Sequence, residues 1–255
     1  MRVVIAPGMN RQRSQPESLT ETSALEIYLL GLVDFDAALF LQERLVYELS
    51  GREDGQGAVL ICEHPPMVTI GREGSRAYVQ ASQQELLARQ LDLRWINRGG
   101  GCIVHGPGQL AVYPIIPLSR REIRPAEYPG RLIETVIDLS AELRVTAWPS
   151  EDGRGVSSRL GRFAEIGAAI KSNVAYHGLF VNVAPAMDLM RLVNSGPRGE
   201  RLTSLSAQRG RAMEMPAVRE AMIRHLKENL GYTRHHVYTG HPLLKRTIRH
   251  IPQTA

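Results

Sequence analysis

The sequence lacks the features that define disulfide-rich, zinc-binding, membrane-spanning and secreted proteins. Its 255 residues include two cysteines, Cys62 and Cys102, and no Cys-x-x-Cys or His-x-x-x-His pair. Two cysteines do not build a disulfide framework, and the pattern lacks the ligand spacing of a zinc site, so we expect no metal and no cofactor. No apolar run approaches the ~20 residues that span a bilayer, and Met1–Ala6 is too short for the apolar core of a signal peptide. We therefore expect a cytoplasmic protein that does not interact with membranes.

Aromatic residues are also scarce, at 5% of the chain, although the formal net charge is +5. Proteins that bind nucleic acid usually concentrate positive charge and combine it with aromatic side chains. Here the charge is spread along the chain, with denser clusters at 120–124 and 245–249. The composition therefore argues against nucleic acid as a partner, and a basic surface favours an acidic protein partner instead.

The 43% of hydrophobic residues is enough for a sizeable core. Apolar runs predict strands over 26–33, 58–62, 67–71, 93–97, 109–116, 163–170, 174–176 and 179–183. Apolar stripes predict helices over 34–50, 83–89, within 125–143, and over 215–230. The polar segment 152–158 is expected to be a mobile loop. These elements predict a single α/β (α+β) domain over 25–232, with an N-terminal extension at 1–24 and a basic tail at 233–255.

The segment from Arg98 to Gln109 is rich in glycine and also carries His105 and Pro107. Glycine allows backbone amides to approach a ligand closely and to adopt positive φ. The segment joins two predicted strands, so it is either an ordinary turn or a loop that contacts a ligand.

Six motifs occur in a fixed order along the chain. They are Glu63-His64-Pro65-Pro66-Met67-Val68-Thr69-Ile70-Gly71-Arg72, Arg98-Gly99-Gly100, His105-Gly106-Pro107-Gly108-Gln109-Leu110 with Tyr113-Pro114, Ile166-Gly167, His177-Gly178-Leu179 with Asn182, and Thr203-Ser204-Leu205. In order and spacing, this set resembles the octanoyltransferase family (lipoyl/octanoyl-protein transferases), which has the biotin/lipoate protein ligase fold. The resemblance covers residues 26–230.

The resemblance implies a mainly antiparallel sheet flanked by helices, and a ping-pong transfer of an octanoyl group. In that mechanism a cysteine thiolate takes the acyl group from acyl carrier protein, and a lysine of a lipoyl domain then attacks the thioester. A neighbouring lysine lowers the pKa of the cysteine. The implied partners are octanoyl-acyl carrier protein and the lipoyl domains of 2-oxoacid dehydrogenase complexes or the glycine cleavage H protein. The implied substrate-binding residues are Arg98, Gly99, Gly100, Gly101, Cys102, Ile103, Val104, His105, Glu165, Ile166, Gly167, His177, Gly178, Leu179 and Phe180.

The sequence departs from the family at both catalytic positions. The nucleophile position, counted back from Thr203, is Ser195; counted forward from Gly167 it is Gly196. The position of the partner lysine is Arg162. Both halves of the Cys/Lys dyad are therefore replaced.

A serine nucleophile needs a general base, because one adjacent charge shifts a pKa by only roughly 1–3 units. Arg162 does not deprotonate in proteins and cannot supply one. By motif, His177 and Glu165 are the nearest bases. We expect the standard activity to be absent or much slowed.

Other residues offer alternatives for the missing groups. Cys102, in the glycine segment, is either an alternative nucleophile or a small apolar residue of a strand, whereas Cys62 is expected in the core. Lys171 is either a relocated lysine or a residue that faces solvent. Arg98 and His105 either contact the acyl carbonyl or phosphopantetheine, or hold the loop by hydrogen bonds.

Three functions stay open at this point. The leading one is an octanoyltransferase-family acyltransferase. The second is a non-catalytic protein that binds an acyl chain or a lipoyl domain. The third is an ATP-dependent lipoate-protein ligase, because Gly99-Gly100-Gly101 followed by His105 also resembles that sister family.

Overall fold

The computed structural model describes residues 23–194 and 200–244. Within these residues the strands form two sheets. The larger has the order β11-β1-β2-β6-β10-β9-β8-β7, with β1 Ala24–Leu32, β2 Gly57–Glu63, β6 Gln109–Pro117, β7 Ala147–Pro149, β8 Gly155–Ser158, β9 Gly161–Lys171, β10 Val174–Asn182 and β11 Arg234–Thr239. The smaller has the order β4-β3-β5, with β3 Met67–Ile70, β4 Asp92–Trp95 and β5 Cys102–His105.

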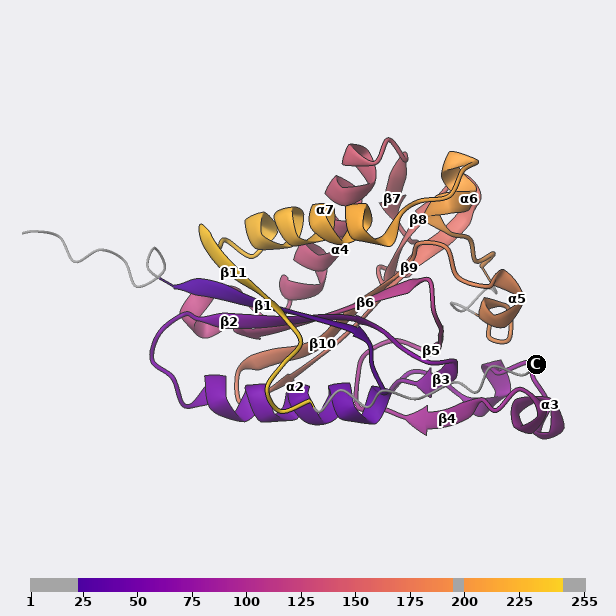
Figure 1. Ribbon diagram of the computed structural model, residues 1–255, viewed down its shortest axis with the longest axis horizontal. Coiled ribbons are helices and arrows are strands. Elements are labelled where there is room, and N and C mark those ends of the chain that lie inside the picture. Colours follow the sequence, from indigo (N-terminus) through magenta and orange to yellow (C-terminus); the bar gives the residue numbers. More distant parts are fainter. Residues whose placement is uncertain (1–22, 195–199, 245–255) are drawn as a thin grey trace, which may run out of the picture.

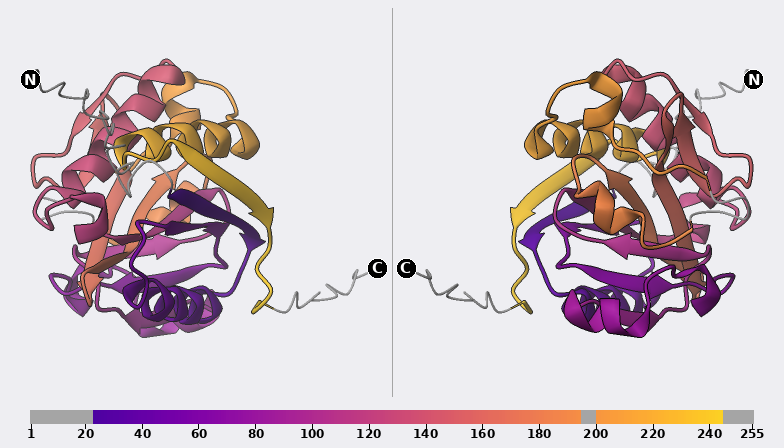
Figure 2. Two further views of the ribbon diagram at one scale, coloured as in Figure 1. Left: turned by 90° about the vertical axis from the view of Figure 1, so that its left-hand side faces the viewer. Right: turned by 90° about the vertical axis from the view of Figure 1, so that its right-hand side faces the viewer.

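Helices cover both faces of the large sheet (Figure 1). Helix α2 (Phe35–Ser50) lies on one face, and α4 (Tyr128–Glu142) and α7 (Met215–Asn229) lie on the other (Figures 1 and 2). The shorter helices are α3 Gln83–Ala88, α5 Met187–Met190 and α6 Leu205–Arg209. None of the helices in the described residues is long and apolar enough to cross a membrane.

Strand β6 illustrates how the sequence produces this layered arrangement. Leu110, Val112 and Ile116 pack in the core on the side of α4 and α7. Ala111 and Tyr113 alternate with them and pack against α2. A strand that is buried on both faces has a continuous apolar run, which is why this run predicts a central strand. The expected α/β class with a mainly antiparallel sheet is confirmed, since only the β1–β2 and β1–β11 pairs of the large sheet are parallel.

Helix α2 begins where the sequence predicts a helix, directly after Asp34. The Asp34 carboxylate accepts hydrogen bonds from the backbone N–H groups of Asp36 and Ala37, at 2.9 and 3.2 Å. Such an N-cap satisfies donors that have no partner within the helix. The apolar stripe that predicts this helix consists of Ala38, Leu41, Leu45 and Leu49, and all four are buried.

Three local predictions are wrong. Residues 155–158 are not a mobile loop but strand β8, because Val156 packs fully in the core and Gly155 lies against β9. The glycine segment is not one loop, since its residues 102–105 form β5 and pair with β3. The two predicted strands 174–176 and 179–183 are one strand, β10, which passes through His177 at a φ of +55° and keeps its register with β9.

The segment expected to be a C-terminal tail contributes a strand as well. Residues 234–239 form β11, which pairs in parallel with β1 at the edge of the sheet. All six of its residues are exposed, so the strand carries no apolar pattern that the sequence would reveal.

Candidate functional site

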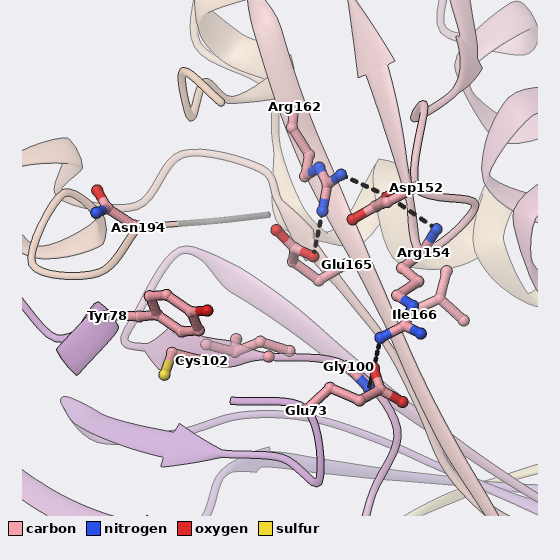
Figure 3. Close-up of a pocket in the computed structure, with 12 residues that line it drawn as sticks. Glu73, Tyr78, Gly100, Cys102, Asp152, Arg154, Arg162, Glu165, Ile166 and Asn194 are labelled. Atoms are coloured by element: carbon pink, nitrogen blue, oxygen red, sulfur yellow. Dashed lines mark hydrogen bonds and ion pairs between the residues drawn. The ribbon is translucent and has the colours of Figure 1, made fainter. Parts of the chain in front are cut away.

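A pocket of about 360 Å³ lies between the glycine segment and strand β9 (Figure 3). Part of its wall is apolar or backbone, formed by Tyr78, Gly100, Gly101, Cys102, Ile103 and Ile166. The other part is polar or charged, formed by Glu73, Asp152, Arg154, Arg162, Glu165 and Asn194. Its volume is at the lower end of the range for small-molecule sites.

Arg162, which the sequence predicts at the partner-lysine position, is surrounded by carboxylates. Its guanidinium donates to Asp152 Oδ1 at 2.7 Å, to Glu165 Oε2 at 3.0 Å and to Glu200 Oε2 at 2.8 Å. The side chain is only 1% exposed. Burial alone would lower the pKa of Arg162, but the charges of Glu165, Asp152 and Glu200 outweigh burial and raise it. Arg162 is therefore a fixed cation and not a group that exchanges protons.

The backbone of Arg162 is tied to the segment that follows 195–199. Its N–H donates to the Arg201 carbonyl at 2.9 Å, and the N–H of Thr203 donates to the Arg162 carbonyl at 2.8 Å. Together with the side-chain bond from Arg162 to Glu200, these contacts attach residues 200–203 to β9. The two predicted nucleophile positions, Ser195 and Gly196, lie outside the described residues.

Arg98 and His105 belong to a buried chain of hydrogen bonds behind the pocket. Arg98 Nη2 donates to Thr69 Oγ1 at 2.8 Å, and that hydroxyl donates to His105 Nε2 at 2.9 Å. His105 Nδ1 donates to Gln109 Oε1 at 2.9 Å. From there the chain continues through Gln109 Nε2 to Asn182 Oδ1 at 3.0 Å, and through Asn182 Nδ2 to the Thr203 carbonyl at 3.2 Å.

This series of hydrogen bonds connects residues from five of the six sequence motifs. It joins the glycine segment, β3, β5, β6, β10 and Thr203, and all its members are buried. Burial lowers the pKa of Arg98 to about 10, which leaves it charged at neutral pH. Burial, assisted by the charges of His64 and Arg98, lowers the pKa of His105 well below its usual value and keeps the ring neutral. Neither side chain lines the pocket.

Two glycines are needed near Arg98, Gly167 because it leaves room for the side chain and Gly100 because of its backbone conformation. A Cβ on Gly167 would lie 2.9 Å from the Gly99 carbonyl oxygen and 3.0 Å from Arg98 Cδ. Gly100 has a φ of +81°, which side chains rarely tolerate. These glycines therefore serve the close packing of β9 on the glycine segment.

Cys102 lines the pocket, and its thiol is hydrogen-bonded to the backbone. Its Sγ donates to the Ser75 carbonyl at 3.2 Å, and Figure 3 shows the sulfur directed away from Arg162 and Glu165. Burial raises the pKa of the Cys102 thiol, although Arg98 and Arg76 oppose the shift. Only a thiolate attacks readily, so this environment disfavours attack. Cys62 is a core residue of β2, as expected, and burial raises its pKa strongly.

The other predicted site residues divide into two groups. Gly100, Gly101, Cys102, Ile103, Arg162, Glu165 and Ile166 line the pocket. Gly99, Val104, Gly167, Lys171, His177, Gly178, Leu179 and Phe180 do not.

His177 and Lys171 are clear cases in the second group. The His177 ring is buried against Tyr176, at 4.6 Å between ring centroids, and its backbone N–H donates to Gln42 Oε1 at 2.9 Å. Burial, assisted by Arg98 and Arg72, lowers the pKa of His177 to about 3. Lys171 is exposed at the end of β9. Of the two bases nearest by motif, only Glu165 is in the pocket wall.

Five residues of the pocket wall were not predicted: Glu73, Tyr78, Asp152, Arg154 and Asn194. Glu73 directly follows the Gly71-Arg72 motif, which is the one signal that points to it. Asp152 and Arg154 lie in the segment expected to be a mobile loop. Among the residues described, no group of three histidine, cysteine or acidic residues is placed to hold a metal ion.

With this geometry in place, similarity to known proteins identifies the family. Residues 34–227 match the family described as lipoyl protein ligase A/B catalytic domain. The chain belongs to this family. It is 36% identical over 198 residues to an octanoyltransferase of Geotalea uraniireducens (strain Rf4), with 76% of this chain and 88% of that protein covered. It is 32% identical over 197 residues to an octanoyltransferase of Desulfotalea psychrophila, with the same shares covered.

Solved structures share the fold at lower identity. A putative lipoate protein ligase of Thermoplasma acidophilum with bound lipoic acid superposes with a TM-score of 0.68 at 15% identity, covering 86% of this chain and 91% of that one. A lipoate-protein ligase A bound with ATP gives a TM-score of 0.69 at 16% identity, covering 86% and 90%. The family resemblance and the expected fold are thereby confirmed.

Proposed function

We propose that this member of the family acts on octanoyl groups, as an acyltransferase between acyl carrier protein and a lysine of a lipoyl domain. The octanoyltransferase relatives support the reaction class. The expected acceptors are lipoyl domains of 2-oxoacid dehydrogenase complexes or the glycine cleavage H protein, and the expected location is the cytoplasm.

One observation carries the proposal. The pocket borders the residues of the family motifs, with Ile103 and Ile166 providing apolar surface and Arg162 marking the dyad position. An acyl chain needs apolar surface, and burial contributes about 0.8 kcal/mol for each methylene.

We further propose that the Cys/Lys chemistry of the family does not operate in this chain. Three carboxylates hold the Arg162 guanidinium, so this position supplies no neutral amine. The raised pKa of Cys102 disfavours it as a substitute. Ser195 is proposed as the residue at the nucleophile position. The same observations favour a second candidate, a protein that binds the acyl chain or a lipoyl domain without transferring anything.

Intact-mass spectrometry after incubation with octanoyl-acyl carrier protein separates these functions. An octanoyl adduct that disappears in Ser195→Ala supports an ester intermediate, and an adduct that disappears only in Cys102→Ala moves the nucleophile to β5. Binding of the carrier without an adduct and without transfer contradicts the transferase and supports the binding protein. Release of pyrophosphate that depends on ATP and lipoate supports the ligase alternative.

A restoration experiment tests the dyad directly. If the double substitution Ser195→Cys and Arg162→Lys yields transfer that neither single substitution yields, the missing dyad accounts for the loss. If the double variant folds and stays inactive, the loss of activity has its origin elsewhere in the site.

A further inference from the structure

An ion pair joins the two sheets across the wall of the pocket. Glu73 follows β3 of the small sheet, and Arg154 precedes β8 of the large sheet, yet the Arg154 guanidinium contacts the Glu73 carboxylate. Both side chains line the pocket and are 42–45% exposed. The pair is therefore a partly exposed contact between the two sheets, in addition to the backbone hydrogen bond from the Gly99 N–H to the Ala168 carbonyl.

Each partner is also fixed by a backbone contact. Glu73 Oε2 accepts a hydrogen bond from the N–H of Gly100 at 3.0 Å. The N–H of Arg154 donates to Asp152 Oδ1 at 3.0 Å, and the Arg154 carbonyl accepts from the N–H of Ile166 at 2.8 Å. The pair is therefore held against the glycine segment on one side and against β9 on the other.

The pair lies away from the end of the pocket that Arg162 and Asn194 form. Asn194 and Glu200 flank residues 195–199, and Arg162 contacts Glu200. In Figure 3, Glu73 and the guanidinium of Arg154 lie on the opposite side of the pocket from Asn194, beside Gly100 and Ile166. An acyl group whose carbonyl is near Arg162 and Asn194 would thus direct its methyl end toward the Glu73–Arg154 pair.

We propose that the Glu73–Arg154 pair limits the length of the acyl chain that the pocket accepts. This inference rests on the proposed function, because it requires an acyl ligand in the pocket. A chain longer than the available space meets two charged groups, which offer no apolar contact and lose their own pairing if they are pushed apart. Without the Arg154 side chain the same space becomes open to further methylenes.

The test compares the binding of two chain lengths. Octanoyl- and decanoyl-pantetheine analogues with an amide in place of the thioester are titrated against the wild type, Arg154→Ala and Glu73→Ala. Each methylene that gains burial strengthens binding about fourfold, so two methylenes correspond to about 15-fold. We expect the wild type to bind the decanoyl ligand no more tightly than the octanoyl ligand. Arg154→Ala and Glu73→Ala should each prefer the decanoyl ligand, by up to about 15-fold. The charge-reversed double variant Glu73→Arg with Arg154→Glu should regain the wild-type ratio.

Arg44→Ala is the matched control, because Arg44 and Glu48 form a similarly exposed ion pair on α2, away from the pocket. It should leave the ratio unchanged. If Arg154→Ala and Glu73→Ala both keep the wild-type ratio while octanoyl binding persists, the pair does not limit chain length, and the proposed function is unaffected. If the wild type binds neither ligand, the proposed function fails and the inference fails with it. Should Arg154→Ala not fold, the ratio in Glu73→Ala decides the question.

Discussion

The guanidinium of Arg162 donates a 2.8 Å hydrogen bond to Glu200, the first described residue after 195–199. Asp152 and Glu165 complete the surroundings of this cation. Arg162, the residue predicted at the partner-lysine position, thus joins three segments of this chain through a fixed charge.

We expect Arg162→Met to destabilise the fold strongly. Removing one partner from a buried ion-pair cluster leaves unpaired charges and costs about 3–5 kcal/mol. Urea unfolding measures the loss. Arg44→Met, in the exposed Arg44–Glu48 pair, is the control and should lower the free energy of unfolding by less than about 1 kcal/mol. Equal effects of the two substitutions would contradict the structural role of Arg162.

Thr69→Val should disrupt the buried chain between Arg98 and His105. The valine methyl neither accepts from Arg98 nor donates to His105. His105 Nε2 then has no partner, at a cost of about 1–3 kcal/mol, whereas Arg98 Nη2 keeps its bond to the Thr69 carbonyl at 3.2 Å. Thr69→Ser keeps the hydroxyl and is the matched control, expected to be much closer to the wild type. Chemical denaturation of both variants measures the difference. Equal stability of the two variants would contradict a stabilising role of the Thr69 hydroxyl.

The protein should lose stability as the pH falls below about 6.5. Burial lowers the pKa of His64 to about 4 and that of His177 to about 3. Since the unfolded chain takes up these protons near pH 6.5 and the folded chain does not, acid favours the unfolded state. Each such histidine removes about 1.4 kcal/mol per pH unit between its unfolded and folded pKa values.

The substitution His177→Asn isolates the contribution of this histidine to the pH dependence of the free energy of unfolding. Asparagine tolerates the positive φ of this position better than most residues and does not titrate. Urea unfolding at pH 7.5, 6 and 5 should show a pH dependence reduced by about 1.4 kcal/mol per unit in this variant. An unchanged slope would mean that His177 is not held neutral by the fold.

Both thiols should react slowly in the folded protein. Burial raises the pKa of Cys62 and of Cys102, and the Cys102 Sγ donates to Ser75. A thiol reagent at pH 8 should therefore modify neither residue rapidly, and both in urea. Rapid labelling of the folded protein that disappears in Cys102→Ser, but not in the control Cys62→Ser, would support Cys102 as a nucleophile.

Local sequence patterns predicted many of the helices and strands of this fold. The apolar run of β6, the Asp34 cap of α2 and Pro216 in the first turn of α7 each act through neighbours in sequence, so their consequences are visible without a structure. The serine- and glycine-rich β8 lacks such a pattern, because it is stabilised by pairing with β9.

The candidate site was only partly predictable for a related reason. Gly100, Gly101, Ile103 and Ile166 follow from motifs that are continuous in sequence. Asp152 and Glu200 meet Arg162 from segments 10 and 38 residues away, and no periodicity links them. Arg98 and His105 were predicted as ligand contacts or as groups that hold the loop. In the structure both side chains are hydrogen-bonded in the buried chain and do not line the pocket, and their role stays a prediction.

The pairing of β11 with β1 has a consequence for how the molecule assembles. Ala24 lies opposite Arg234, so the two strands close a loop of about 210 residues, and β11 is an exposed edge strand. Closing long loops costs chain entropy before any contact repays it. Strand β11 should thus dock late in folding and open first in the native state, and its amides should exchange with solvent deuterium sooner than those of β6.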